Sequence, residues 1–359
     1  RKYGGDEYVK YFTCWNQLLA LMSGQLSNRE SLRNLIVALE THQGKTCHLG
    51  PGKHITRSNL ANANPNRDYH IFEAYAYYMV EQARGKQKTD IFKLGGNVYA
   101  FDSTTIGLCL SVFCWVKFCK RRGGIKVPLY YDIETQTPAF FHITAASVHD
   151  SKAMGKILYE TGAYCIFDED TTTSKAFLEL KPLAPIFVRA KVNLQFKAMR
   201  WKRRLPESVL SDAIGELTVY NSSKAYPDKY VKFAAGKARQ LTFLTNSMEP
   251  SPLQVAELYK NGWQVELFFK WFKQHLKIKK FWGATENAAR IQIYSAIITY
   301  CLVATIQYDL RLDRSTYEVL QVLSISLADK TLLSELFNKA NSKNDKERSG
   351  YSEPNLFNF

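Results

Sequence analysis

The sequence predicts an α/β fold in which a mixed sheet follows an all-helical N-terminal domain. Two apolar runs that each end in an acid, Asn97–Asp102 and Ala163–Asp168, are typical of buried strands. Two β-rich runs, Ile125–Asp132 and Ala139–Thr144, flank a turn-forming segment and predict a hairpin. A helical pattern over Ser151–Thr161 follows the hairpin, and strands that alternate with helices favour an α/β sheet.

The composition indicates a globular protein with a polyanionic partner. Hydrophobic residues make up 46% of the 359 residues, and the formal net charge is +15. Because the basic residues are spread along the chain, a membrane surface is a weaker explanation than nucleic acid. The longest apolar stretch, Ile291–Ile306, contains polar residues such as Gln292 and predicts a buried helix, so no membrane association is expected.

The seven cysteines form no Cys-x-x-Cys pair, which indicates reduced thiols in a cytosolic protein. Cys47, His48 and His54 have no fourth ligand nearby, so we predict no zinc site. No secretory segment opens the chain, and because Arg1 is not an initiator Met we expect residues to precede it.

Four helices are predicted before the sheet. They cover Asp6–Gly24, a segment opened by a capping box at Ser27–Glu30, Thr56–Asn64 up to Pro65, and Asp68–Arg84. The third helix is short and polar, and its Arg57 and Asn59 can make bidentate contacts to guanine and adenine edges. The spacing is explained equally well by a DNA-binding helix-turn-helix motif and by a polar loop followed by a surface helix. The residues leave both alternatives open.

A β-rich insertion is predicted over residues 182–250. Its short apolar runs, each bounded by turn residues, are Ile186–Arg189, Leu217–Tyr220, Tyr230–Phe233 and Leu241–Leu244. Within it, Arg200–Arg204 interleaves Trp201 with four cations, a pattern that can hold phosphates and stack on an exposed base. A surface strand whose Trp201 packs inward is the competing explanation.

One long helix, started by Ser251 and continuing to about Gly283, follows the insertion. At about 3.6 residues per turn, Tyr259, Glu266 and Lys273 fall within roughly 60° of one another on one face. Such a face is ordinarily the solvated edge of an amphipathic helix. Glu266 is, however, the only acid between residues 258 and 282 amid several lysines, which favours a metal ligand beside a polyanion.

Three carboxylates are predicted to share one site. Asp102 and Asp168 end predicted strands, and active sites of open α/β sheets gather at the carboxyl ends of strands. Together with Glu266 they would repel one another unless cations neutralised them, and their oxygens suit Mg²⁺ or Mn²⁺. Two such ions can activate an attacking hydroxyl and stabilise the leaving oxygen in phosphoryl transfer, so we predict a two-ion site.

The helix residues also carry a family resemblance. Tyr259, Glu266 and Lys273 keep the spacing of a Tyr-x2-Arg-x3-Glu-x6-Lys signature, and the segments Phe101–Thr104 and Ile166–Asp168 match those around two family acids. On these residues the chain resembles bacterial insertion-sequence transposases of the insertion sequence four family. The resemblance implies a ribonuclease-H-like DDE domain with a β-rich insertion and with Asp102, Asp168 and Glu266 as catalytic residues.

The resemblance implies a DNA transposase that cuts and joins strands at insertion-sequence ends. Its partners would be double-stranded DNA, as terminal inverted repeats and as target, and a second copy of the chain in the DNA complex. It would act in the bacterial cytoplasm, on the nucleoid. The residues expected to contact DNA are Tyr259, Lys273, Lys270, Arg189, Lys191, Arg57 and Asn59.

Two departures from the family pattern leave an alternative open. Gly262 stands where the family has Arg, and Glu169 and Asp170 follow Asp168, so Asp170 is a second choice for the middle acid. The alternative is a catalytically impaired remnant that binds DNA without cutting it. A non-specific nuclease of the same fold is a further possibility.

The predicted organisation has five parts: a helical DNA-binding domain (1–90), the first part of the catalytic domain (91–181), the β-rich insertion (182–250), the C-terminal helices of the catalytic domain (251–338) and a disordered tail (339–359).

Overall fold

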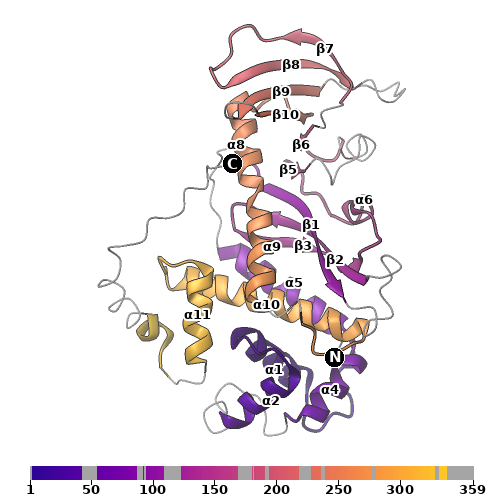
Figure 1. The fold of residues 1–359 in the computed structure, drawn as a ribbon, viewed down its shortest axis with the longest axis vertical. Helices are drawn as coiled ribbons and strands as arrows, with labels where there is room; N and C mark the ends of the chain where they lie inside the picture. The colour runs from indigo at the N-terminus through magenta and orange to yellow at the C-terminus, as the bar shows by residue number, and fades with distance from the viewer. Residues whose placement is uncertain are drawn as a thin grey trace. The chain divides into compact units, whose positions relative to one another are not determined.

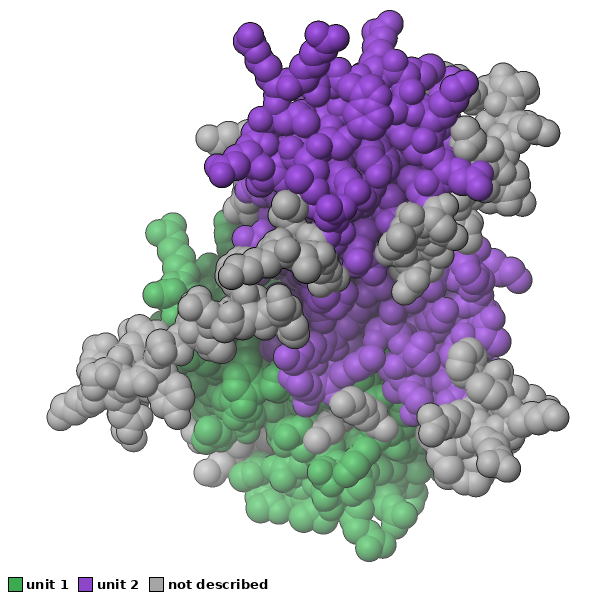
Figure 2. Space-filling model, turned by 45° about the horizontal axis from the view of Figure 1, so that its top comes forward, with its two compact units in different colours: residues 1–73, 275–283, 287–359 green, residues 74–274, 284–286 purple. Residues whose placement is uncertain are grey.

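The computed structural model of the chain divides into two compact units (Figure 2). Unit 1 comprises residues 1–73, 275–283 and 287–359, and unit 2 comprises residues 74–274 and 284–286. The residues that the structure describes are 2–42, 55–86, 92, 94–108, 123–168, 180, 182–190, 194–217, 228–235, 239–276, 278, 280–327 and 331–337. The predictions for Lys191, for Glu169 and Asp170, for the Cys47, His48 and His54 group and for the tail lie outside these residues.

Helices form unit 1. They are α1 (Cys14–Leu26), α2 (Leu32–Thr41), α4 (Arg57–Asn66), α10 (Glu286–Asp309) and α11 (Thr316–Ser326), and α5 (His70–Lys86) runs from unit 1 into unit 2. The hydroxyls of Thr13, Ser31 and Thr56 cap α1, α2 and α4. The predicted capping box at Ser27 is wrong, because Ser27 ends α1 and Ser31 is the residue whose side chain accepts a backbone N–H at the start of α2.

The core of unit 1 joins the two ends of the chain. Gly24 of α1 packs against the Trp282 ring so closely that a Cβ would lie 2.4 Å from Cη2. The Asn287 side chain donates to the carbonyl oxygens of Asn64, at 2.8 Å, and Arg67. By length and composition α10 could cross a membrane, but 78% of its apolar window is buried, as is usual for the central helix of a globular unit.

Unit 2 is built on a mixed sheet (Figure 1). Within the described part of the chain nine of its ten strands follow the order β3-β2-β1-β5-β6-β10-β9-β8-β7, and the tenth, β4, pairs with β2. The strands nearest the N-terminus are β1 (Val98–Leu108), β2 (Gly123–Asp132), β3 (Thr137–Phe141), β4 (Thr144–Ala145), β5 (Tyr164–Phe167) and β6 (Ile186–Arg189). The pairs β1–β5 and β5–β6 are parallel and the others antiparallel, which confirms the predicted mixed α/β sheet.

The insertion strands extend the same sheet. They are β7 (Phe196–Trp201), β8 (Val209–Leu217), β9 (Asp228–Ala235) and β10 (Arg239–Thr245), and β10 pairs with β6. Strand β6, which was predicted as part of the insertion, pairs parallel with β5 on one side and antiparallel with β10 on the other. Most of the strand predicted over Leu217–Tyr220 lies outside the described residues, and β7 overlaps the surface strand that was one alternative for Arg200–Arg204.

Helices cover the sheet on both faces. The short α6 (Asp150–Met154) packs in a buried cluster with Phe101 and Phe167. The predicted long helix is two helices, α8 (Pro252–Gly262) and α9 (Gln264–His275), separated by Trp263, whose backbone remains in the αR region. Because Trp263 keeps helical dihedrals, the side chains of α8 and α9 stay nearly in register across the break.

Candidate active site

Two acidic side chains lie next to each other on the parallel strands β1 and β5. Phe101 pairs with Phe167, and Asp102 and Asp168 are the next residues along each chain. Since side chains alternate along a strand, the two Phe rings enter the buried cluster while both carboxylates point to the opposite face. Strand β1 does not end at Asp102 as predicted but continues to Leu108 in the hairpin with β2.

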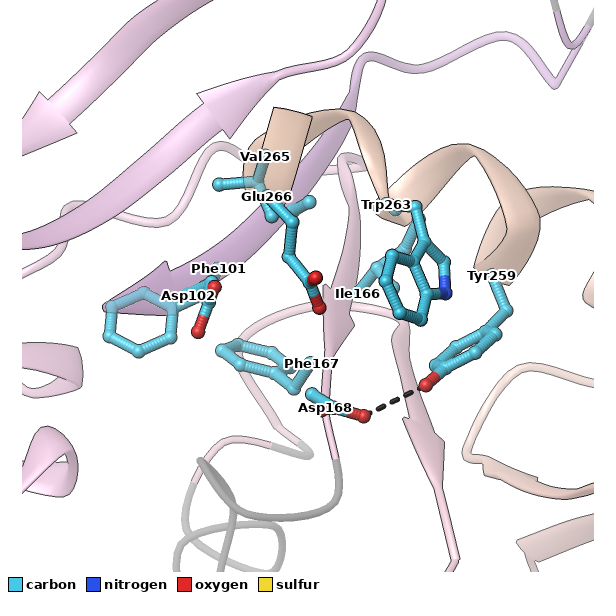
Figure 3. A pocket seen from close by; sticks show the side chains of 11 residues that line it. Phe101, Asp102, Ile166, Phe167, Asp168, Tyr259, Trp263, Val265 and Glu266 are labelled. Atoms are coloured by element: carbon cyan, nitrogen blue, oxygen red, sulfur yellow. Dashed lines mark hydrogen bonds between the residues drawn. The ribbon is translucent and has the colours of Figure 1, made fainter. Parts of the chain in front are cut away.

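Helices α8 and α9 bring the third acid to the same place. One small pocket is lined by Asp102, Asp168, Tyr259, Trp263 and Glu266. The carboxyl groups of the three acids face its interior (Figure 3). The break at Trp263 therefore does not separate Tyr259 from Glu266. The three acids that were predicted from different segments of the sequence are neighbours in the structure.

The acids disfavour one another's charge. Burial, and then the charges of Glu266 and Asp168, raise the pKa of Asp102 to about 7, although the Ser103 backbone N–H, 2.7 Å from Oδ1, opposes the rise. Burial and the charge of Asp168 also raise the pKa of Glu266 above its usual value. A cation in the pocket would remove this repulsion.

Tyr259 holds the second acid in place. Its hydroxyl donates to Asp168 Oδ1 at 2.8 Å (Figure 3), and its ring packs on Phe243 with centroids 4.7 Å apart. Burial and Asp168 raise the pKa of Tyr259, while the nearby Arg189 side chain lowers it through a hydrogen bond and its charge. Tyr259 and Arg189, both predicted to hold phosphates, are thus found together at the edge of the pocket.

Gly262 is close-packed against the sheet. A Cβ at this position would lie 3.0 Å from Ile166 Cγ2 of β5, which is tighter than almost all contacts of real Cβ atoms. A side chain at position 262 would therefore require the buried Ile166 to shift by a few tenths of an ångström.

The other predicted DNA contacts do not line the pocket. Lys270 on α9 is exposed and Lys273 half-buried. Arg57 and Asn59 are exposed on α4, which belongs to unit 1. Lys191 lies outside the described residues.

Two residues near the site were not predicted to belong to it. Trp263, with 52% of its surface exposed, lines the pocket between Tyr259 and Glu266. Asp150 starts α6; its charge adds to the rise in the pKa of Asp102, and its Oδ1 lies 3.3 Å from Lys126 Nζ. Sequence spacing gives no signal for Asp150, because only the folded sheet brings α6 near β1.

A family model described as the transposase DDE domain matches residues 93–302, more than half of the chain. The chain belongs to this family. A second model, of a domain of unknown function, matches residues 1–51. The DDE match contains Asp102, Asp168 and Glu266 and so covers the whole pocket.

This DDE-domain chain is similar to three proteins named as transposases. The protein y4zB of Sinorhizobium fredii is 34% identical over 61% of this chain and 63% of its own length. A transposase for insertion sequence element IS5377 of Geobacillus stearothermophilus is 29% identical over 56% and 54%. One for element IS4SA of Synechocystis is 22% identical over 70% and 72%. The chain therefore spans less than two thirds of the first two relatives.

A solved piggyBac transposase synaptic complex with hairpin DNA aligns with 95% of the chain and 78% of that protein, with 12% identity and a TM-score of 0.48.

DDE transposases generally use divalent metals. No group of three His, Cys, Asp or Glu side chains within the described ranges is close enough to hold an ion as the side chains stand. The donor set nevertheless suits a hard divalent cation, since it consists of carboxylate oxygens, and burial together with their mutual repulsion raises the pKa values of Asp102 and Glu266.

Proposed function

We propose that this chain is a DNA transposase that cleaves and transfers strands at insertion-sequence ends with divalent metal ions. The observation that carries the proposal is the meeting of Asp102, Asp168 and Glu266 around one pocket of a DDE-family domain. The net charge of +15 fits a DNA partner. Double-stranded DNA and a second copy of the chain would complete the assembly.

Each side chain has a role in this proposal. Asp102, Asp168 and Glu266 would hold two Mg²⁺ or Mn²⁺ ions, which when bound activate the attacking hydroxyl and stabilise the leaving oxygen. Tyr259 positions the Asp168 carboxylate through the 2.8 Å hydrogen bond. Arg189 lies beside Tyr259 and would hold the terminal phosphate, with Lys270 and Lys273 on α9 and Lys191 after β6 supporting the DNA backbone.

The test is strand cleavage of DNA that carries the inverted repeats flanking the gene. Loss of a residue that only supports a metal ligand reduces metal affinity or activity by about 10–100-fold. Because Glu266 is proposed as a ligand itself, Glu266→Gln should reduce Mg²⁺-dependent cleavage by more than 100-fold. Glu257→Gln, an exposed acid on α8, is the matched control and should cut like the parent. If Glu266→Gln cuts as well as the parent, the assignment of the pocket is wrong.

A DNA-binding remnant is the second candidate, and Gly262 favours it. The signature Arg is absent, and Ile166 fills the space beside Gly262. The remnant predicts that the parent binds end-containing DNA but cuts it in neither Mg²⁺ nor Mn²⁺. Cleavage that requires the end sequence excludes both the remnant and a non-specific nuclease.

A further inference from the structure

Strand β7 forms the outer edge of the sheet in unit 2 (Figure 1). Among the described residues it pairs with β8 alone, and Phe196 at its start stacks on Tyr230 with ring centroids 5.0 Å apart. Beyond Phe196 the strand turns outward: Met199 is 53% and Trp201 63% exposed. The prediction that Trp201 packs inward is therefore wrong, and the segment Met199–Arg204 is called the basic edge below.

The basic edge is strongly cationic. Arg200, Lys202, Arg203 and Arg204 are all exposed, and no acid occurs between residues 196 and 206. Lys202 pairs with Asp212 at 3.2 Å, whereas no ion pair to a described residue involves Arg200, Arg203 or Arg204. Three guanidinium groups next to an exposed indole thus face solvent.

Protection of a sheet edge explains only part of this surface. Edge strands are often blunted by charged residues and bulges that prevent pairing with other chains, and β7 has a bulge between Ala198 and Arg200. Such protection gives no reason to expose a Trp and a Met on the same edge, because both favour association. The aromatic and apolar exposure points to a ligand.

The charges decide which ligand. A second copy that paired edge to edge would place the same cations against one another, which opposes a symmetric interface. A polyanion is favoured instead, and an unpaired base offers a flat face to Trp201 where a duplex hides it. Cations interleaved with an aromatic are typical of surfaces that bind single strands.

We propose that the basic edge binds single-stranded DNA, with the phosphates on Arg200, Arg203 and Arg204 and a base stacked on Trp201. This rests on the proposed function for the identity of the nucleic acid. The sheet order places β7 five strands from β5, on the order of 24 Å from Asp168 at about 4.8 Å per strand. The surface is therefore distinct from the pocket.

The test is fluorescence anisotropy of the full chain with a labelled 12-nucleotide oligothymidine in EDTA, so that no cleavage occurs. Loss of one stacked base costs about 1–3 kcal/mol, so Trp201→Ala should weaken binding by about tenfold or more. Trp201→Phe should keep most of the affinity, whereas Trp201→Leu should weaken binding like Trp201→Ala because it is apolar without a stacking face. The variants of this exposed residue should melt within a degree or so of the parent.

The cations are tested by salt dependence. Arg203→Gln and Arg204→Gln should each reduce the slope of log affinity against log salt by about 0.7 for a single strand. Lys152→Gln, an exposed cation of α6 in the same unit, should leave the slope unchanged.

Three results would overturn the inference: no binding of oligothymidine by the parent, an affinity of Trp201→Ala equal to the parent's, or an equal loss for a 12-base-pair duplex. Each is independent of strand cleavage. A chain that binds through Trp201 but never cuts DNA would contradict the proposed function and leave the basic edge intact.

Discussion

At the scale of residues, the charged form of Asp102 is disfavoured in the folded protein when no cation is bound. Burial and two neighbouring carboxylates raise its pKa from a usual 3.8 to about 7. Because the folded state holds this proton more tightly than the unfolded chain, the group destabilises the fold only where it must ionise. The resulting loss in the free energy of unfolding is absent below pH 3.8, grows up to about pH 7 and is complete above that pH.

Asp102→Asn should therefore stabilise the protein in EDTA at pH 8.5. For a half-buried group we expect about 1–2 kcal/mol, or roughly 1–3 °C in melting temperature for a chain of 359 residues, with a smaller gain at pH 5.5. Saturating Mg²⁺ should raise the melting temperature of the parent more than that of the variant. Differential scanning calorimetry at the two pH values is the measurement, and a variant that melts below the parent at pH 8.5 in EDTA contradicts it.

Gly262 gives a second prediction at this scale. Gly262→Ala would ordinarily favour a helix by about 0.5–1 kcal/mol, but here the new methyl would lie 3.0 Å from Ile166 Cγ2. Overpacking of this kind costs about 1–3 kcal/mol, so we expect a lower denaturation midpoint in urea for Gly262→Ala and a larger loss for Gly262→Arg. In an Ile166→Ala background, Gly262→Ala should lower the denaturation midpoint by less than it does in the parent. Equal costs in both backgrounds would show that the contact does not limit this position.

At the scale of elements, α8 links the insertion to the catalytic strands. It contacts β1, β5 and β6 as well as β8 and β9. The buried Lys229 of β9 donates to the carbonyl oxygen of Pro250, just before the Ser251 cap of α8. Burial lowers the pKa of Lys229, and the charge of the buried Asp212 opposes that change. Lys229 therefore anchors the start of the helix that carries Tyr259, and Asp212 favours its charged form.

Lys229→Met should destabilise the protein by about 3 kcal/mol, because it removes the donor to Pro250 and leaves Asp212 with Lys202 alone. Asp212→Leu in the same chain should recover part of the loss, since no uncompensated carboxylate then remains buried. Lys232→Met on the same strand is the control and should change stability little. Urea denaturation of the parent, Lys229→Met, Asp212→Leu and the double variant gives the coupling free energy between the two residues. Losses of stability that simply add would contradict an interaction between Lys229 and Asp212.

Sequence patterns predicted the elements whose signals are local. The hairpin of β2 and β3, the strand before Asp168 and the helix α10 lie close to their expected positions. The differences have non-local causes. Strand β1 extends beyond Asp102 because β2 pairs with it to Leu108, and β6 joins the catalytic sheet because β5 lies beside it. The sequence predicted that the three acids share a site, whereas only the fold shows that Asp150 and Trp263 lie near them.

At the scale of the whole molecule, the compact units do not follow the order of the chain. The N-terminal helices share unit 1 with α10 and α11, although the sequence suggested a separate domain over residues 1–90. Contacts between the two ends are specific. The Trp282 ring fills the space beside Gly24, and the Tyr294 hydroxyl donates to Glu73 at 2.7 Å.

A fragment of residues 1–90 should therefore not fold alone. It would expose the surface that Trp282 covers, and the Asn64 and Arg67 carbonyls would lose their Asn287 donor. Isolated helices of about 10–13 residues are marginal in water without such packing. We expect low helicity by circular dichroism and no cooperative urea transition, while the full chain shows both. A sharp transition in the fragment would mean that the N-terminal helices form an independent domain and that α10 only docks against it.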